Sequence, residues 1–145
     1  MAHALATIGY EQATLGAVIA RLKVAGVDTV IDVRAVAASR RPGFSKTILS
    51  TSLAAEGIGY RHLRSLGTPA DGRAAARRGR VAEMHAIFEA HLATEAAQAQ
   101  LAEATEIAKH RHAALLCYES DHAGCHRAIL AARIAAVLDC PIETL

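Results

Sequence analysis

The sequence contains few aromatic residues and no long apolar run. Aromatic residues make up 3% of its 145 residues, whereas hydrophobic residues make up 52%. The core must therefore be built mainly from alanine, leucine, valine and isoleucine, which suits close packing of helices on a sheet. No apolar run approaches the roughly 18 residues of a membrane span, and no basic segment followed by an apolar one begins the chain. We therefore expect a cytoplasmic protein with no membrane contact.

Cysteine is also scarce, at Cys117, Cys125 and Cys140. An odd number of cysteines in a cytoplasmic chain argues against a disulfide framework. Cys117 lies in an apolar run and Cys140 ends the last predicted helix, so we interpret both as small core residues. Cys125 lies near a predicted helix start, where the thiolate form is favoured, and is the candidate reactive thiol.

The formal net charge is +2, which is too small to indicate a nucleic-acid partner by itself. Of the 16 basic residues, only Lys23, Lys46 and Lys109 are lysines. Arginine suits bidentate contacts with carboxylates and phosphates, so the composition favours a small anionic ligand. A GC-rich coding sequence would also produce a chain rich in alanine and arginine.

The apolar pattern predicts strands that alternate with helices in one domain, residues 1–145. The predicted strands cover residues 5–10, 27–33, 58–63 and 114–118, with a short edge strand at 141–145. Helices are predicted to start after Thr14 and Ser45 and to cover residues 81–92 and 94–110, and a last helix carries Ile129 to Leu138. This alternation indicates parallel strands with right-handed crossovers. We predict an α/β fold: a single three-layer domain with a mostly parallel sheet of four or five strands flanked by helices.

Residues 64–80 are predicted to form a long polar loop. Loops of this length in compact domains are usually functional lids or flexible. Their arginines, Arg73, Arg77, Arg78 and Arg80, belong either to a solvated loop, to a mobile lid over an anion or to a nucleic-acid contact. Because no aromatic residues are interleaved with them, stacking on single strands is not favoured.

Polar residues follow each of the four longer predicted strands. The carboxyl ends of parallel strands share one edge of a sheet, which is where open α/β sheets bind ligands. We therefore expect convergence there of Gly9 and Tyr10, Asp32 and Arg34, His62, and Glu119, with Gly9 and Tyr10 contacting the ligand.

The two acidic residues in this set are candidate catalytic groups. Asp32 can act as a base or accept a hydroxyl, or it can form an ion pair with Arg34 that closes the sheet edge. Glu119 can act as a general acid or base, or as a nucleophile toward a sugar carbon. The alternative for Glu119 is a carboxylate paired with Arg127 or capping backbone N–H groups.

Cys125 and His126 are adjacent, so on a helix their side chains point about 100° apart. They need not act on each other, and His62 or His122 is an alternative base for Cys125. A zinc site at Cys117, His122, Cys125 and His126 is a further option, but the spacing is not a familiar zinc signature. We therefore predict no metal and no cofactor.

The anion site is the chemical hypothesis that the basic residues favour most. Phosphate or another anion is expected to bind Arg34, Arg40, Lys46 and Arg127, with His126 also at the ligand. Helix N-termini at Lys46 and Cys125 would add free N–H groups and partial positive charge.

Several motifs in order cover nearly the whole chain. They are Thr7-Ile8-Gly9-Tyr10, Ile31-Asp32-Val33-Arg34, Ser39-Arg40-Arg41-Pro42-Gly43-Phe44-Ser45-Lys46, Gly57-Ile58-Gly59-Tyr60-Arg61-His62-Leu63, Leu66-Gly67, and Leu116-Cys117-Tyr118-Glu119 followed by Cys125-His126-Arg127. This set resembles the domain of unknown function 488 family. The resemblance implies a fold and a site more than a reaction.

We predict from the sequence an enzyme that acts on a small phosphorylated or nucleotide-like ligand. Asp32 and Glu119 would do acid–base or nucleophilic work, assisted by His62 and Cys125. The alternatives are a non-catalytic module that binds an anion or a nucleic acid, and a thiol enzyme that depends on Cys125. The oligomeric state is left open.

Overall fold

The structure, a computed structural model, describes residues 3–119 and 125–145. Its strands are β1 (Leu5–Gly9), β2 (Thr29–Asp32), β3 (Gly59–His62), β4 (Ala113–Cys117) and β5 (Ile142–Thr144). Its helices are α1 (Leu15–Val24), α2 (Lys46–Ala55), α3 (Ala70–Arg77), α4 (Val81–Leu92), α5 (Glu95–His110) and α6 (His126–Leu138), with a 3₁₀ turn, η1, at Arg64–Leu66.

All five strands pair in parallel, in the order β3-β2-β4-β1-β5. Leu115 in the central strand β4 pairs with Thr7 of β1 on one side and with Ile31 of β2 on the other. Strands β1, β2 and β4 are buried along their whole length, as expected for parallel strands covered on both faces. The predicted α/β fold with a parallel sheet is confirmed.

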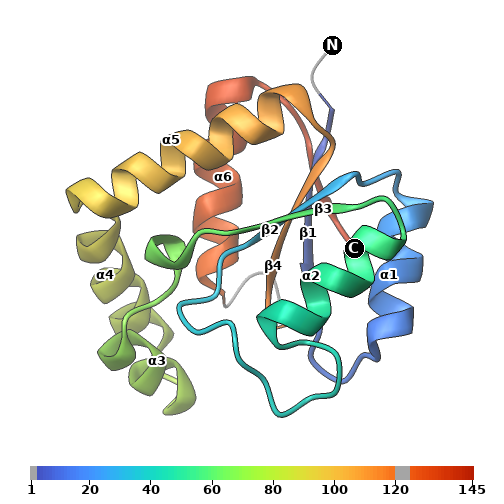
Figure 1. Ribbon diagram of the computed structural model, residues 1–145. Helices are drawn as coiled ribbons and strands as arrows, with labels where there is room; N and C mark the ends of the chain where they lie inside the picture. Colours follow the sequence, from blue (N-terminus) through green and yellow to red (C-terminus); the bar gives the residue numbers. More distant parts are fainter. Residues whose placement is uncertain (1–2, 120–124) are drawn as a thin grey trace.

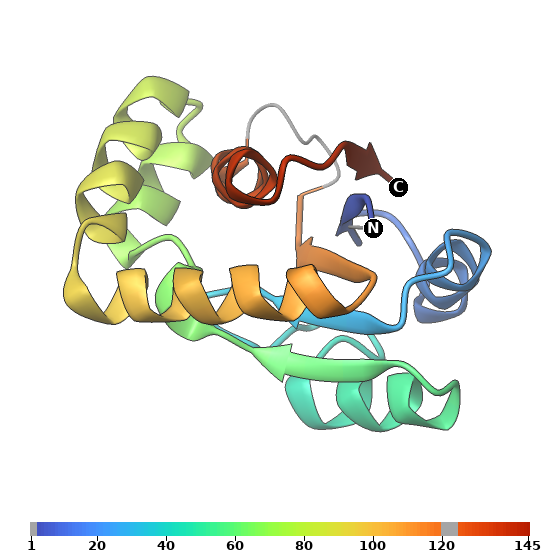
Figure 2. The same ribbon diagram turned by 90° about the horizontal axis from the view of Figure 1, so that it is seen from above.

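Helices cover both faces of the sheet and give a single domain of three layers (Figures 1 and 2). Successive strand residues point to opposite faces, so neighbours enter different cores. Val30 and Leu116 pack with α1 and α2, whereas Ile31 and Leu115 pack with α4, α5 and α6. In the part of the chain that the structure describes, no helix is both long and apolar enough to span a bilayer.

The helix boundaries follow local capping chemistry. Thr14 caps α1 as predicted, because its hydroxyl accepts a hydrogen bond from the Ala17 N–H at 3.1 Å. Ser45 is the N-cap of α2, but its hydroxyl bonds to Ser39 and not to the helix. Gly26 follows α1 with φ of +77°, a conformation that favours glycine.

The prediction of a loop over residues 64–80 is wrong. This segment contains η1 and the eight-residue helix α3. Alanines are strong helix formers, and Asp71 in the first turn suits the positive end of the helix dipole. The arginines and glycines of this segment gave no apolar helical pattern, because the buried residues of the helix are Gly72 and Ala75.

Candidate functional site

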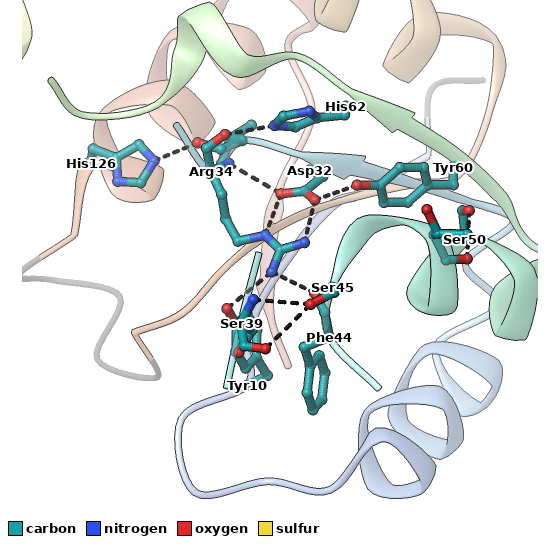
Figure 3. A network of polar contacts seen from close by, with 12 residues as sticks. Tyr10, Asp32, Arg34, Ser39, Phe44, Ser45, Ser50, Tyr60, His62 and His126 are labelled. Carbon is teal, nitrogen blue, oxygen red and sulfur yellow. Dashed lines mark hydrogen bonds and ion pairs between the residues drawn. The ribbon is translucent and has the colours of Figure 1, made fainter. Parts of the chain in front are cut away.

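The first polar group at the sheet edge is an ion pair at the end of β2. Arg34 donates to Asp32 twice, from Nε to Oδ1 at 2.8 Å and from Nη2 to Oδ2 at 2.7 Å. Asp32 is fully buried and Arg34 is 6% exposed. Tyr60 in β3 donates its hydroxyl to the same carboxylate, so both carboxylate oxygens are engaged (Figure 3).

The remaining donor of the guanidinium is also engaged. Arg34 Nη1 donates to the hydroxyl of Tyr10 at 3.1 Å and to the carbonyl of Phe44 at 2.7 Å. The rings of Tyr10 and Phe44 stack with their centroids 4.2 Å apart. Burial lowers the pKa of Arg34, but the bonds and charge of Asp32 outweigh this and raise it overall. We call Tyr10, Asp32, Arg34 and Tyr60 the ion-pair network.

His62 at the end of β3 belongs to the scaffold of this network. Its Nε2 lies 2.8 Å from the carbonyl oxygen of Arg34, so Nε2 carries the proton and donates. His62 does not line the cavity described below, and its printed hydrogen bond joins β3 to the end of β2. Its assistance to Cys125 stays a prediction.

The second polar group lies where β4 ends and α6 begins. We call Cys117, Glu119, Cys125, His126 and Arg127 the thiol cluster. The two sulfur atoms are 2.9 Å apart, and Glu119 Oε2 lies 3.3 Å from Cys117 Sγ and 3.4 Å from Cys125 Sγ. Both cysteines are 1% exposed. Cys117, which we expected to serve only as a core residue, therefore also contacts the candidate reactive thiol.

His126 is positioned to share a proton with Cys125. Its Nε2 lies 2.9 Å from the carbonyl of Val33, which can only accept, so Nε2 is protonated and Nδ1 faces Cys125 Sγ at 3.6 Å. The predicted divergence of about 100° between these side chains assumed that both residues are helical. Cys125 is instead the N-cap of α6, with an extended backbone at φ −115° and ψ 147°. The alternative base, His122, lies outside the described residues.

These contacts divide the two cysteines into a thiolate and a thiol. The hydrogen bond from Cys117 and the neighbouring His126 outweigh burial and the negative charge of Glu119, both of which raise the pKa, and lower the pKa of Cys125 to about 6. Burial and the contact with Cys125 raise the pKa of Cys117. Burial alone would lower the pKa of His126, but its bond to Cys125 raises it overall. At neutral pH the cluster therefore favours a Cys125 thiolate beside a neutral Cys117, and the contact with Cys125 favours the protonated form of His126.

Arg127 is fully buried behind the sulfur atoms. Its Nη1 donates to the Glu119 carbonyl at 2.8 Å and to Cys117 Sγ at 3.4 Å, so it bonds to the backbone of Glu119. Its Nε and Nη2 are buried without a hydrogen-bond partner among the described residues. The Nη1 group of Arg127 therefore contacts the backbone and a sulfur of this cluster, and Arg127 does not line the cavity described below.

Gly9 gives the cluster its close contact with β1. A Cβ at this position would lie 1.7 Å from the Glu119 carbonyl oxygen and 2.8 Å from Arg127 Nη1. Glycine is therefore required for the approach of the chain after β4 to the end of β1. The prediction of Gly9 as a ligand-binding residue stays untested, and its visible role is to admit this backbone.

A cavity of about 540 Å³ opens above the thiol cluster. Cys117, Glu119, Cys125 and His126 line it, together with an apolar wall that includes Val36, Val81, Met84 and the ring of Tyr118. Among the predicted site residues, Tyr10, Arg34, Arg40, Glu119, Cys125 and His126 line the cavity. Gly9, Asp32, His62, Lys46 and Arg127 do not. Lys46 is exposed on α2.

The cavity rim carries positive charge. Arg40 comes from the loop after β2, and Arg73 and Arg77 come from successive turns of α3. Arg40 and Arg77 are exposed, and Arg73 donates from Nη1 to the carbonyl of Thr68 at 3.0 Å. Within the described ranges 3–119 and 125–145, no carboxylate pairs with any of the three. The sequence pattern placed Arg73 and Arg77 in a predicted loop, whereas both lie on α3.

Four cluster residues also present metal-ligating atoms within 4.8 Å of one another: Cys117, Glu119, Cys125 and His126. Tetrahedral zinc with Zn–S bonds of about 2.3 Å holds two sulfurs roughly 3.8 Å apart. The observed separation of 2.9 Å is too short for this arrangement, and Arg127 already places a positive charge 3.4 Å from Cys117 Sγ. The geometry favours a direct contact between two thiols.

The chain belongs to the family described as Domain of unknown function DUF488, whose profile matches residues 14–134. The match includes both cysteines of the thiol cluster and all three rim arginines. Comparison with curated proteins and with solved structures finds no match.

Proposed function

We propose that this protein is a cysteine-dependent group-transfer enzyme that acts on a small anionic substrate, phosphorylated or nucleotide-like. The observation that carries the proposal is the contact between Cys125 and His126 at the floor of a cavity that Arg40, Arg73 and Arg77 also line. A nucleophile beside a base that is itself oriented by a third group is the arrangement expected for covalent catalysis. Here the third group is the carbonyl of Val33.

The thiolate of Cys125 is stabilised from three directions. Cys117 contacts its sulfur at 2.9 Å, the N–H of Arg127 donates to it at 3.4 Å, and His126 lies on a third side. The N–H bond belongs to the first turn of α6, where unsatisfied N–H groups also favour negative charge. These contacts explain a reactive thiolate without a metal ion.

The cavity walls indicate the class of substrate. Arg40, Arg73 and Arg77 suit a phosphate or carboxylate, because guanidinium groups form paired hydrogen bonds with both. The aromatic ring of Tyr118 and the side chains of Val81 and Met84 suit an apolar or flat body attached to that anion. A phosphorylated or nucleotide-like molecule combines both properties.

The proposed reaction proceeds in two steps. The Cys125 thiolate attacks the electrophilic atom of the substrate, a covalent bond to sulfur forms, and the bond to the leaving group breaks. The protonated His126 gives its Nδ1 proton to the leaving group as the negative charge develops there. Water, deprotonated by Glu119 or His126, then cleaves the bond to sulfur and regenerates the thiolate.

Protection against alkylation tests the binding half of this proposal. Iodoacetamide labelling of Cys125 is followed by peptide mass spectrometry with adenosine monophosphate or with uncharged adenosine present. We expect the phosphate-bearing ligand to slow labelling and adenosine to have little effect. Arg77→Ala should weaken the protection by about tenfold, the value of one charge-assisted hydrogen bond. Equal protection by both ligands would contradict the anion site.

A burst experiment tests the covalent half. Mixing the protein with p-nitrophenyl phosphate should release a burst of nitrophenolate of up to one equivalent per chain, with a matching mass increase on Cys125. Cys125→Ser should lose the burst, whereas Cys140→Ser should keep it because Cys140 lies beyond the far end of α6. Binding of adenosine monophosphate with no burst and no adduct would instead support a non-catalytic anion-binding module.

A further inference from the structure

The thiol cluster contains a second cysteine that the proposed group transfer uses only as a hydrogen-bond donor. Cys117 Sγ lies 2.9 Å from Cys125 Sγ, compared with about 2.05 Å in a disulfide bond. The two cysteines come from different elements, the end of β4 and the N-cap of α6. Cys140 lies beyond the opposite end of α6 and is no part of this contact.

We propose that Cys117 and Cys125 form a peroxide-reactive dithiol that closes into an internal disulfide and thereby switches off Cys125 as a nucleophile. This inference rests on the proposed function in one respect, the assignment of Cys125 as the nucleophile. It adds a second substrate class, a hydroperoxide, and a chemical role for Cys117 as the resolving thiol.

The chemistry balances in two steps. The Cys125 thiolate attacks the outer oxygen of the hydroperoxide, the O–O bond breaks, and Cys125 becomes a sulfenic acid while the peroxide is reduced to an alcohol or water. His126 supplies the proton to the departing oxygen. Cys117 sulfur then attacks Cys125 sulfur, the S–S bond forms, and the hydroxyl of the sulfenic acid leaves with the Cys117 proton as water.

The environment of each sulfur suits its part in this sequence. Cys125 is the sulfur with the lowered pKa, and Cys117 is the one that keeps its proton. Arg127 Nη1 lies 3.4 Å from Cys117 Sγ, where it stabilises negative charge as Cys117 loses that proton. A disulfide would also release Cys117 from donating to Cys125 and leave no thiolate on the cavity floor.

The positions of the cysteines in the sequence allow the internal disulfide to be detected by peptide mass spectrometry. Both cysteines fall in the tryptic peptide His112–Arg127, whereas Cys140 falls in the peptide that follows Arg133. Reduced protein is treated with hydrogen peroxide, blocked with iodoacetamide and digested. We expect the first peptide to lose two hydrogens and to resist alkylation, and dithiothreitol to reverse both changes. The Cys140 peptide should remain alkylated throughout.

Variants of Cys117 separate this inference from the proposed function. In the Cys117→Ser variant, peroxide should leave a sulfenic acid on Cys125 that dimedone traps. If circular dichroism shows that this variant folds poorly, Cys117→Ala replaces it in the same experiment. Wild-type protein should show the internal bridge in place of the adduct. A dimedone adduct on wild-type Cys125 with no bridge would overturn the inference.

Two further outcomes would also overturn it. In one, wild-type Cys125 does not react with peroxide but is still labelled by iodoacetamide. This result would reject the peroxide-reactive dithiol and leave the proposal of Cys125 as a nucleophile standing. The other is one equivalent of zinc in the purified protein that protects both cysteines until a chelator is added. Failure of Cys125 to react with either reagent would reject both proposals.

Discussion

Two buried arginines at the same edge of the sheet have opposite surroundings. Arg34 follows β2, and all three of its guanidinium nitrogens have partners in Asp32, Tyr10 or Phe44. Arg127 lies in the first turn of α6, and two of its guanidinium nitrogens have no hydrogen-bond partner in the part of the chain that the structure describes. Arg34 is neutralised by a carboxylate, whereas Arg127 faces a carbonyl and a sulfur.

The difference supports a structural role for the ion-pair network and agrees with the proposed reactive role of the thiol cluster. A buried ion pair whose guanidinium nitrogens are all hydrogen-bonded is costly to break by removal of one partner, and it has little capacity left for a ligand. A buried cation favours negative charge nearby, and the guanidinium of Arg127 contacts the sulfur of Cys117, while the backbone N–H of Arg127 donates to the sulfur of Cys125. The ion-pair network therefore holds the strand ends in place, and the thiol cluster beside it is suited to chemistry.

Removal of the carboxylate from the ion-pair network should have the largest effect on stability. Asp32→Ala leaves Arg34 buried without its counter-ion, and we expect a loss of about 3–5 kcal/mol in the free energy of unfolding. Urea denaturation followed by circular dichroism measures this loss. Tyr60→Phe, which removes one hydrogen bond to the same carboxylate, serves as the milder control at about 1 kcal/mol. An Asp32→Ala variant as stable as the wild type would contradict the structural role.

A side chain at Gly9 should disturb the thiol cluster from the side of β1. Gly9→Ala places a methyl group 1.7 Å from the Glu119 carbonyl oxygen, so the backbone at residue 119 must move. We expect a loss of about 1–3 kcal/mol, typical of overpacking, and slower alkylation of Cys125 at pH 7. Gly16→Ala in α1 has open space around its Cβ and is the matched control. Equal behaviour of the two variants would argue against the close contact.

Replacement of Arg127 should cost less than loss of Asp32, which is the direct test of the contrast between the two arginines. Arg127→Met fills similar volume and removes two donors that have no partner within residues 3–119 and 125–145, so we expect a loss below about 2 kcal/mol. The pKa of the Cys117 thiol should rise further, because the nearby positive charge lowers it in the wild type. Denaturation and the pH dependence of Cys117 alkylation measure the two effects. A loss larger than that of Asp32→Ala would reverse the comparison.

An exposed ion pair should show how little a surface arginine contributes to the free energy of unfolding. Arg61 and Glu103 pair between β3 and α5 with their side chains 58% and 37% exposed. Solvent screens such a pair, and we expect Arg61→Ala to change the free energy of unfolding by less than about 1 kcal/mol. The same denaturation experiment in high salt should show almost no further change. A loss comparable to that of Asp32→Ala would mean that burial is not what distinguishes these arginines.

Periodicity and capping predicted most of the fold. The span of α4 at Val81–Leu92, the Thr14 cap and the parallel sheet all follow from local pattern and from strands alternating with helices. Helix α3 was missed because its buried face consists of Gly72 and Ala75, which carry almost no apolar signal. Local patterns identify an element only where that element buries enough apolar surface.

The convergence of polar side chains at one sheet edge could be predicted from the sequence, and their contacts only in part. The rule for strand ends brought Asp32, Arg34 and Glu119 to one edge. It could not show that Tyr10 and Phe44 complete the partners of Arg34, because those contacts join segments far apart in the sequence. The contact between the sulfur atoms of Cys117 and Cys125 likewise depends on where α6 begins relative to β4. Such contacts follow from tertiary packing, which one sequence does not specify.

The pH dependence of Cys125 alkylation tests the central claim most directly. The rate constant for iodoacetamide labelling of Cys125 is measured from pH 4.5 to 9.5 beside that of Cys140, with mass spectrometry to separate the two peptides. A lowered pKa means that the thiolate forms as pH rises through that value, so Cys125 labelling should reach half its maximum near pH 6 and then level off. A midpoint near the free thiol value of about 8.5 for Cys125 would contradict a thiolate held by Cys117, His126 and the start of α6.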